Sequence, residues 1–246
     1  MIYARIIRNE IRQKLGSLTA VFGFILLSAL LVAAASSLIM ELSSSLDRLF
    51  HAAKTPHFVQ MHAGKINRAE INRWAEADER VERIQIVEMI TVDGSALVLP
   101  KSQSPETNSV MDISFVVQNS EFDHLLNTDN SIAQVEPGQI GVPVYYAEER
   151  GVEVGDVITV TANGFSEEYT VSSIIRDSQM NPAIVHSKRF LVHLNDYDEL
   201  QEHFSETEYL IEFRLSEPQR IDAFTADYQA SGLPSLGPVV DQQLFK

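Results

Sequence analysis

The pattern of hydrophobic and polar residues divides the first 50 residues into three segments: a basic amphipathic stretch, an apolar run and a helical repeat. In residues 1–16, Arg5, Arg8 and Arg12 share one helical face, which is typical of an amphipathic helix lying in the headgroup layer. Residues 18–40 carry no charge, and as a helix they cover roughly 35 Å, enough for the hydrocarbon core of a bilayer. The run predicts a transmembrane helix that includes Leu18, Phe22, Leu26, Leu30 and Met40.

The helical repeat continues beyond the apolar run. Leu42, Leu46, Leu49 and Phe50 recur at steps of three and four residues, with serine and charged residues between them. We interpret this repeat as a stalk that leaves the membrane and packs its apolar stripe on a partner helix. Pro56 ends it, because proline and the residue before it resist helical continuation.

A cleaved signal peptide is a second interpretation of the N-terminal pattern. The basic start and apolar core fit it, and the alanines at residues 33–35 fit the small-residue cleavage pattern. Against it, the apolar run continues through residues 38–40, which is longer than the usual apolar region of a signal peptide. We favour a retained span, and cleavage after Ala35 stays open as the alternative.

Beyond residue 55 the pattern changes to short strands and short helices. Residues 57–62 and 83–90 are typical of strands, and they flank a helix predicted over residues 67–78. Asn67 is the expected N-cap of that helix, and Glu70 stands at its third position. The far end of the chain repeats the order strand, helix, strand over residues 209–215, 218–231 and 238–242.

The middle of the chain has a different pattern. Residues 91–108 are rich in turn formers and predict a turn followed by a loop. Residues 140–164 predict a strand, one helical turn and a strand, and residues 168–175 predict a returning strand after a hairpin at Asn163-Gly164. A further strand and a short helix starting near Asn195 are expected within residues 190–200.

These elements predict an α+β fold behind an N-terminal membrane helix. The two ends of the chain form a platform, and a mostly-β lobe is inserted between them. We expect an amphipathic cytoplasmic elbow over residues 1–16 and a membrane helix with its stalk over residues 17–54. The platform is expected to combine residues 55–90 with residues 205–246, and the lobe to cover residues 91–204.

Charge and composition narrow the function and orient the helix. The chain has 19 Lys and Arg against 34 Asp and Glu, a net charge of −15, which argues against nucleic-acid binding through a broad basic face. The basic residues concentrate before the apolar run, so we place the N-terminus in the cytoplasm and the main domain outside the plasma membrane. The absence of cysteine excludes disulfides, thiol catalysis and Cys-ligated metals.

The sequence carries no recognised catalytic or metal motif. GxSxG, SxxK, HExxH, GxGxxG and Walker A patterns are all absent, so we predict neither an enzyme nor a cofactor. We expect His51, His57 and His62 to be exposed or capping residues, because positions 57 and 62 face opposite sides of a strand. Residues 195–199 superficially resemble a calcium loop, but lack its glycine and final glutamate and fit a helix N-terminus instead.

One polar loop is a candidate contact site. It follows an apolar strand and precedes Pro182, so an ordinary turn is the simpler interpretation. The functional interpretation is a contact loop at the tip of the inserted lobe. Its residues are Arg176, Asp177, Ser178, Gln179, Met180 and Asn181.

Several segments together resemble the FtsX-like (MacB-like) ABC transporter permeases, over essentially the whole chain. The resemblance is carried by the basic elbow before one span and by the segments KTPHFVQMHAG, VPVYYAEERGVEVGDVITV, IIRDSQMNPAIVHSKRFLV and YLIEFRL. The spacing of Ala147, Gly151 and Gly155-Asp156 is similar to a turn of the MacB-type core domain. The resemblance implies an outer domain with a porter-like platform and an inserted lobe.

The resemblance also implies partners. In this family a permease dimer, of identical or different subunits, pairs with a cytoplasmic ABC ATPase, and a stalk transmits the movement of the membrane helices. The chain ends at Phe245-Lys246, near where the next span of the family is expected, so we expect the N-terminal portion of a permease or a truncated product.

Two other functions remain open. A single-span anchored module could use its acidic outer domain to bind a cationic peptide or an envelope ligand. A secreted enzyme released by cleavage after Ala35 is the third candidate, and the missing catalytic motifs weigh against it.

Overall fold

The computed structural model describes residues 15–100, 112–162, 164–180 and 187–241. The chain divides into two compact units, Met1–Arg48 and Leu49–Lys246, and we call the second the outer unit. The elements are, in chain order, α2 (Leu15–Ala53), β1 (Phe58–Ala63), α3 (Arg68–Ala77), β2 (Val81–Val92), η1 (Gly94–Ala96), β3 (Leu97–Val98), β4 (Asp112–Val116), β5 (Leu126–Asn127), β6 (Gln139–Pro143), α4 (Val144–Arg150), β7 (Val157–Ala162), β8 (Phe165–Arg176), β9 (Ser187–Val192), α5 (Leu194–His203), β10 (Thr207–Leu215), η2 (Pro218–Arg220), α6 (Ile221–Ala230) and β11 (Val239–Asp241).

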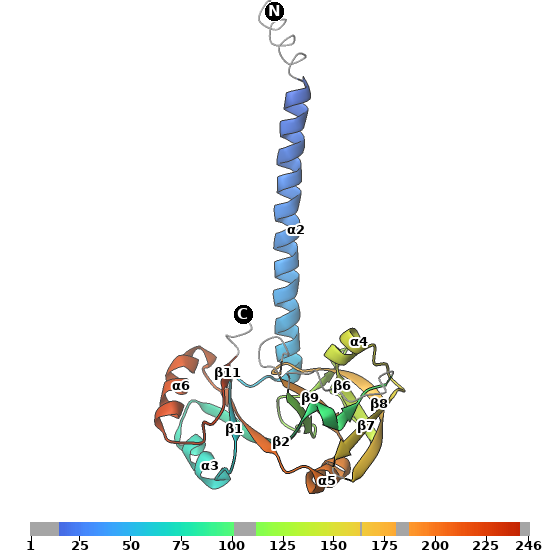
Figure 1. Ribbon diagram of the computed structural model, residues 1–246. Helices are drawn as coiled ribbons and strands as arrows, with labels where there is room; N and C mark the ends of the chain where they lie inside the picture. The colour runs from blue at the N-terminus through green and yellow to red at the C-terminus, as the bar shows by residue number, and fades with distance from the viewer. Residues whose placement is uncertain (1–14, 101–111, 163, 181–186, 242–246) are drawn as a thin grey trace, which may run out of the picture. The chain divides into compact units, whose positions relative to one another are not determined.

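The predicted membrane helix and stalk form one helix, α2, which Figure 1 shows without a break. Within the described part of the chain it is the one helix long and apolar enough to cross a membrane, over Thr19–Ala53. Its apolar side chains between residues 19 and 42 are exposed, as expected of a surface that lipid or another helix covers in the membrane. α2 ends at Ala53, three residues before Pro56.

The strands of the outer unit form a single mixed sheet in the order β11-β1-β10-β2-β4-β9-β6-β8-β7-β3, with β5 paired to β8. The β4–β9 and β6–β8 pairs are parallel, and the other paired strands are antiparallel. Strands from both ends of the chain therefore lie side by side in β11-β1-β10-β2, where the platform was expected. The fold class is α+β, as predicted from the sequence.

Local sequence features set the ends of the platform helices. Asn67 caps α3, and its side chain accepts a hydrogen bond from the backbone N–H of Glu70, as the capping pattern predicts. Pro218 opens the turn η2 that leads into α6. Gly232 follows α6 with φ of 77°, a left-handed conformation that glycine adopts without strain.

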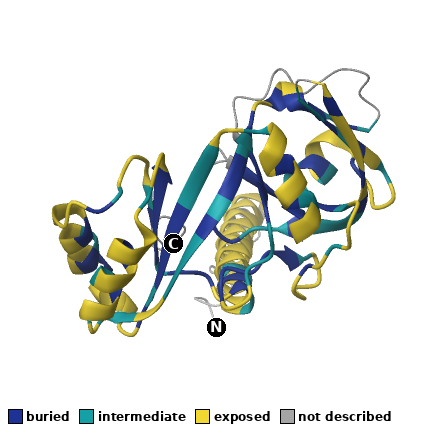
Figure 2. Cartoon of the chain, turned by 90° about the horizontal axis from the view of Figure 1, so that it is seen from below, coloured by how far each residue is buried: buried dark blue, intermediate teal, exposed yellow. Residues whose placement is uncertain are grey.

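Side chains alternate between the two faces of the platform strands. One face packs on α3 and α6 through an aromatic cluster, in which Trp74 lies edge-on to Phe213, Phe224 and Tyr228. The cluster fits the expectation that Trp74 is a core residue. The opposite face, which includes Val59, packs against apolar residues of the lobe. Figure 2 shows α3 and α6 with their outer surfaces exposed, whereas the strands between them and the lobe are mostly buried or intermediate.

The lobe has its own core around β4, β6, β7, β8 and β9, closed by α4 and α5. β7 and β8 form the predicted hairpin, with Gly164 at φ of 87°, whereas Asn163 lies outside the described residues. The sequence pattern did not predict β4, which is short and joins the lobe to the platform by pairing with β2 on one side and β9 on the other.

Candidate functional site

The last turn of α2 is built into the core of the outer unit. Leu49 and Ala53 are buried and pack against Leu126, and Phe50 is buried beside them. By contrast, Leu42 is 63% exposed. Between Leu42 and Leu49, which is about two turns of helix, the apolar side chains thus change from exposed to buried in the outer unit.

The helix ends in a tight, hydrogen-bonded turn. The N–H of Thr55 donates to the carbonyl of Phe50 at 3.0 Å, and the N–H of Lys54 donates to that of His51 at 3.2 Å, the two bonds of a Schellman motif. Lys54 occupies the left-handed position of this motif, with φ of 49°, where glycine is usual. Lysine at this position carries a backbone cost of about 1 kcal/mol relative to glycine.

A short segment, residues 119–126, which we call the clamp segment, holds this turn. The N–H of His124 donates to the carbonyl of Ala53 at 2.8 Å, and the N–H of Asp123 donates to that of Lys54 at 3.2 Å. The ammonium of Lys54 donates in return to the carbonyl of Glu121 at 3.2 Å. These bonds satisfy carbonyls at the C-terminal end of α2 and fix the helix end to the clamp segment.

A buried guanidinium joins the clamp segment to the lobe. Arg189 of β9, 1% exposed, donates Nη1 to Asp123 Oδ2 at 2.6 Å. It also donates Nη2 and Nε to the two oxygens of Asp177, at 2.6 and 2.7 Å, in a bidentate pair. One arginine on β9 therefore connects the clamp segment with the segment that follows β8.

The charges in this cluster stabilise one another. Burial alone would raise the pKa of Asp177, but the charge and hydrogen bonds of Arg189, together with two backbone N–H donors, lower it overall. Burial opposes the charge of Arg189, and its two carboxylate partners outweigh that effect and raise its pKa. The Asp177–Arg189 pair therefore stabilises the fold above the ordinary pKa of an aspartate, and this contribution is lost as pH falls.

A third carboxyl connects the cluster to the platform. Glu212 of β10 is fully buried, and the side-chain N–H of Gln85 donates to its Oε2 atom. The same Gln85 nitrogen donates to the carbonyl of Phe122 in the clamp segment at 3.1 Å. Burial, and then the negative charge of Asp123, raise the pKa of Glu212 well above its usual range. The clamp segment is thus bonded to α2, to β9 and, through Gln85 of β2, to Glu212 of β10.

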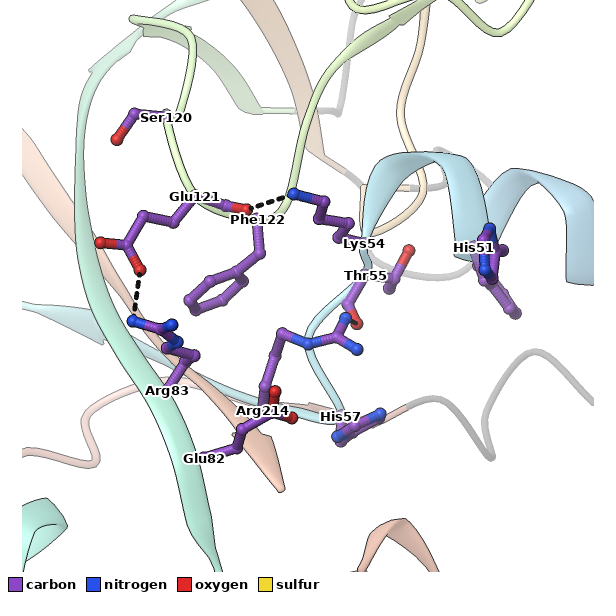
Figure 3. Close-up of a pocket in the computed structure, with 11 residues that line it drawn as sticks. His51, Lys54, Thr55, His57, Glu82, Arg83, Ser120, Glu121, Phe122 and Arg214 are labelled. Atoms are coloured by element: carbon purple, nitrogen blue, oxygen red, sulfur yellow. Dashed lines mark hydrogen bonds and ion pairs between the residues drawn. The ribbon is translucent and has the colours of Figure 1, made fainter. Parts of the chain in front are cut away.

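A cleft of about 770 Å³ opens beside this junction (Figure 3). Arg83 and Glu121 face each other across it at 3.5 Å, and both are about 60% exposed, so their pairing contributes little. Arg214 donates Nη1 to the carbonyl of Thr55 at 3.0 Å. The lining comes from the helix end, the start of β2, the clamp segment and the end of β10: Phe50, His51, Lys54, Thr55, His57, Glu82, Arg83, Ser120, Glu121, Phe122 and Arg214.

The structure places the candidate contact loop differently from the expectation of an exposed tip. Ser178, Gln179 and Met180 are buried, and the side chain of Asp177 is 7% exposed. Arg189 binds Asp177. The hydroxyl of Thr55 donates to the hydroxyl of Ser178 at 2.7 Å, and Met180 belongs to the apolar core. Arg176 ends β8 and donates to Asn130 at 2.8 Å, and Asn181 lies outside the described residues. The described part of the loop is thus part of the junction.

The other sequence-predicted positions differ in how far they are buried. Phe22, Leu26, Leu30, Met40 and Leu42 are exposed, Leu46 is half-buried, and the side chain of Leu18 lies outside the described residues. Leu49 and Phe50 are buried within this chain. A stalk contact with a partner helix therefore stays a prediction that depends on Leu42 and Leu46.

Two of the three clustered histidines bind backbone. Nδ1 of His57 accepts the N–H of Leu215 at 2.8 Å, and Nδ1 of His62 accepts that of Leu236 at 3.1 Å. Residues 195–199 lie in α5, where Asp196 accepts the N–H of Gly138 at 2.9 Å. In the described ranges, no group of three or more His, Asp or Glu residues is arranged to hold a metal ion.

Sequence reasoning missed the junction residues Asp123, Arg189 and Glu212. Two of them left a trace, because Arg189 stands at the head of the apolar run of β9 and Glu212 interrupts the apolar run of β10. A lone charge inside an apolar strand indicates a buried, paired group. Which groups pair depends on long-range contacts that no local pattern specifies.

Comparisons with known proteins give likenesses of fold at low identity. No family model matches the chain, and no curated protein matches it. Among solved structures, the periplasmic region of MacB from Actinobacillus actinomycetemcomitans is similar, with a TM-score of 0.44 and 7% identity over 80% of this chain and 93% of that chain.

Two further solved structures are similar. A domain of a provisionally named permease protein from Porphyromonas gingivalis matches with a TM-score of 0.37 and 12% identity, over 74% of this chain and 86% of that one. A provisionally named lipoprotein from Bacillus anthracis matches with a TM-score of 0.38 and 8% identity, over 74% and 95%. The FtsX-like assignment stays a prediction.

Proposed function

We propose that this chain is the membrane anchor and extracytoplasmic domain of an ABC transporter permease subunit, and that α2 transmits movement from the membrane to the outer unit. One observation carries the proposal: a helix with a bilayer-spanning apolar stretch continues unbroken until its last turn is enclosed by the outer unit. A flexible linker would be the expected connection if the helix served only as a tether.

The junction supports a mechanical role. The clamp segment is bonded to the end of α2, to Arg189 in the lobe and, through Gln85, to the platform. A displacement of the helix end must therefore move the clamp segment or break several hydrogen bonds and a buried ion pair. Mutually bonded, buried groups of this kind favour movement as a body over local bending.

The sequence supports an external source of energy. The sequence contains no Walker A motif, and we propose a cytoplasmic ABC ATPase as the source of ATP hydrolysis. The exposed apolar side chains of α2 offer a surface to lipid and to further spans or a second permease subunit. The basic residues before the helix support a cytoplasmic N-terminus.

The cleft beside the junction favours a second candidate function, a single-span binding module. Its volume lies within the range of small-ligand sites, and Lys54, Arg83 and Arg214 line it in an otherwise acidic chain. Two glutamates also line it, and the negative end of the α2 dipole lies there, which weakens any attraction for an anion. We therefore rank this function second.

Cysteine labelling tests the proposal on a clean background, because the chain contains no cysteine. In intact spheroplasts, a membrane-impermeant maleimide is expected to label Ser43→Cys, whereas Ser17→Cys should react only after permeabilisation. ATP depletion should change the labelling rate of Ser43→Cys, because movement of the stalk alters its surroundings. The reverse labelling pattern would contradict the proposed orientation. A labelling rate of Ser43→Cys that does not change on ATP depletion would favour the binding module.

A further inference from the structure

Three carboxyl groups and one guanidinium form a cluster inside the junction. Asp123 and Asp177 pair with Arg189, and Glu212 lies within hydrogen-bonding reach of Asp123. Asp123, Arg189 and Glu212 are at most 1% exposed, and the Asp177 side chain is 7% exposed. With all four groups ionised, the cluster would hold two uncompensated negative charges in a buried site, which is very costly.

The hydrogen bonds of Glu212 indicate which carboxyl group of the cluster is neutral. Gln85 donates to one oxygen of Glu212, and the other, Oε1, is buried without an N–H or O–H donor among the described residues. Two carboxyl oxygens can hydrogen-bond to each other only with a proton between them. At the neighbouring strand positions β1 and β2 contribute Val59 and Gln85, neither of which carries a charge.

We propose that Glu212 carries a proton at neutral pH and donates it in a hydrogen bond to Asp123, and that this shared proton keeps the clamp segment closed against the platform. The titratable groups around it are Asp123 in the clamp segment, Arg189 on β9 and, beyond the guanidinium, Asp177. Arg189 and Asp177 stay charged, so Glu212 is the group that titrates. The inference deepens the proposed function, because it makes the transmitting junction sensitive to pH.

The direction of the pH effect follows from proton linkage. In the closed junction the pKa of Glu212 is raised by burial and by Asp123, whereas in an opened junction it returns to the ordinary range of a glutamate. Between these two values opening releases one proton. The opening equilibrium therefore rises about tenfold per pH unit until the raised pKa is reached. Closure is strongest in mild acid and is lost as pH rises.

Hydrogen exchange tests this in the full chain, held in detergent micelles or nanodiscs. In the wild-type protein, protection of amides in residues 119–126, corrected for the intrinsic exchange rate, is expected to fall about tenfold per pH unit between the ordinary pKa of a glutamate and the raised pKa of Glu212. In Glu212→Gln the amide donates permanently to Asp123, so the corrected protection should not vary with pH. Glu168→Gln, at an exposed glutamate on β8, is the matched control and should behave as the wild type.

Two outcomes would overturn the inference: protection that does not depend on pH in the wild type, or the same dependence in Glu212→Gln. If that variant does not fold, infrared spectroscopy of the wild type decides instead. A protonated carboxyl band should be present at neutral pH and disappear on alkaline titration, and its absence overturns the inference. Neither readout involves nucleotide or a partner, so a failure here is distinct from a failure of the proposed transport role.

Discussion

Replacing Arg189 by methionine is expected to destabilise the outer unit by about 3–5 kcal/mol, because it leaves two buried carboxylates without their counter-charge. The arginine is 1% exposed and donates three short hydrogen bonds, at 2.6, 2.6 and 2.7 Å, to Asp123 and Asp177. For a unit of this size the loss corresponds to a fall in Tm on the order of 10 °C. Thermal unfolding of the full chain, followed by circular dichroism in detergent, measures it.

Two variants distinguish the effect of breaking the buried ion pairs from the effect of removing a positive charge elsewhere. Arg83→Met removes a guanidinium whose ion pair with Glu121 is exposed, so it should cost less than about 1 kcal/mol. The triple variant Arg189→Met, Asp123→Asn, Asp177→Asn removes all three charges and should recover much of the lost stability. An equal cost for Arg83→Met and Arg189→Met would show that the network is not a major source of stability.

A flexible seven-residue insertion after Ser44 is expected to abolish ATP-dependent movement of the outer unit. Glycine costs about 1 kcal/mol per residue in a helix, so a Gly-Gly-Ser-Gly-Gly-Ser-Gly insert should interrupt α2 while leaving the outer unit folded. The readout is the ATP-dependent change in maleimide labelling of Glu202→Cys, an exposed position on α5, in the assembled transporter. With the flexible insert the change should fall to background while ATP hydrolysis continues.

A helical insert of the same length is the control. Seven residues with high helix propensity lengthen α2 by about 10 Å and rotate the following face by only about 20°. This variant should therefore retain most of the ATP-dependent labelling change. If both inserts, or neither, abolished the change, helix continuity would not be what transmits the movement.

Local patterns were sufficient for the elements whose ends depend on neighbouring residues. The unbroken α2 follows from an uncharged apolar run joined to a helical repeat, and the capping bond from Asn67 to Glu70 follows from their spacing. The β7–β8 hairpin follows from a glycine turn between two strand patterns. In each case the stabilising contact lies within a few residues of the feature that predicts it.

The junction could not be predicted in this way, because its partners are far apart in the chain. Asp123 and Arg189 are separated by 66 residues, and Gln85 and Glu212 by 127. The segment after β8 contains charged and amide side chains, which in isolation suggest an exposed loop. It is buried because Arg189 neutralises Asp177 and Thr55 bonds Ser178, and both partners come from other elements.

The order of strands was predictable only in part. Two similar strand and helix units at the ends of the chain indicated that they lie together, and β11-β1-β10-β2 agrees with that pattern. The parallel pairs β4–β9 and β6–β8 left no such trace, because parallel partners are joined by long crossovers. β4 is five residues long and follows a segment without a clear pattern, so its role between platform and lobe emerges only from the three-dimensional structure.

The central claim, which we propose, is that movement of α2 reaches the outer unit through the clamp segment. A distance measurement between spin labels on Ser43→Cys and Glu202→Cys tests it most directly, in the full chain in nanodiscs, with labelled copies diluted by unlabelled protein. The account predicts one narrow distance distribution, which the flexible insert after Ser44 broadens. A broad or multiple distribution in the protein without the insert would show a hinge at the junction and contradict the account.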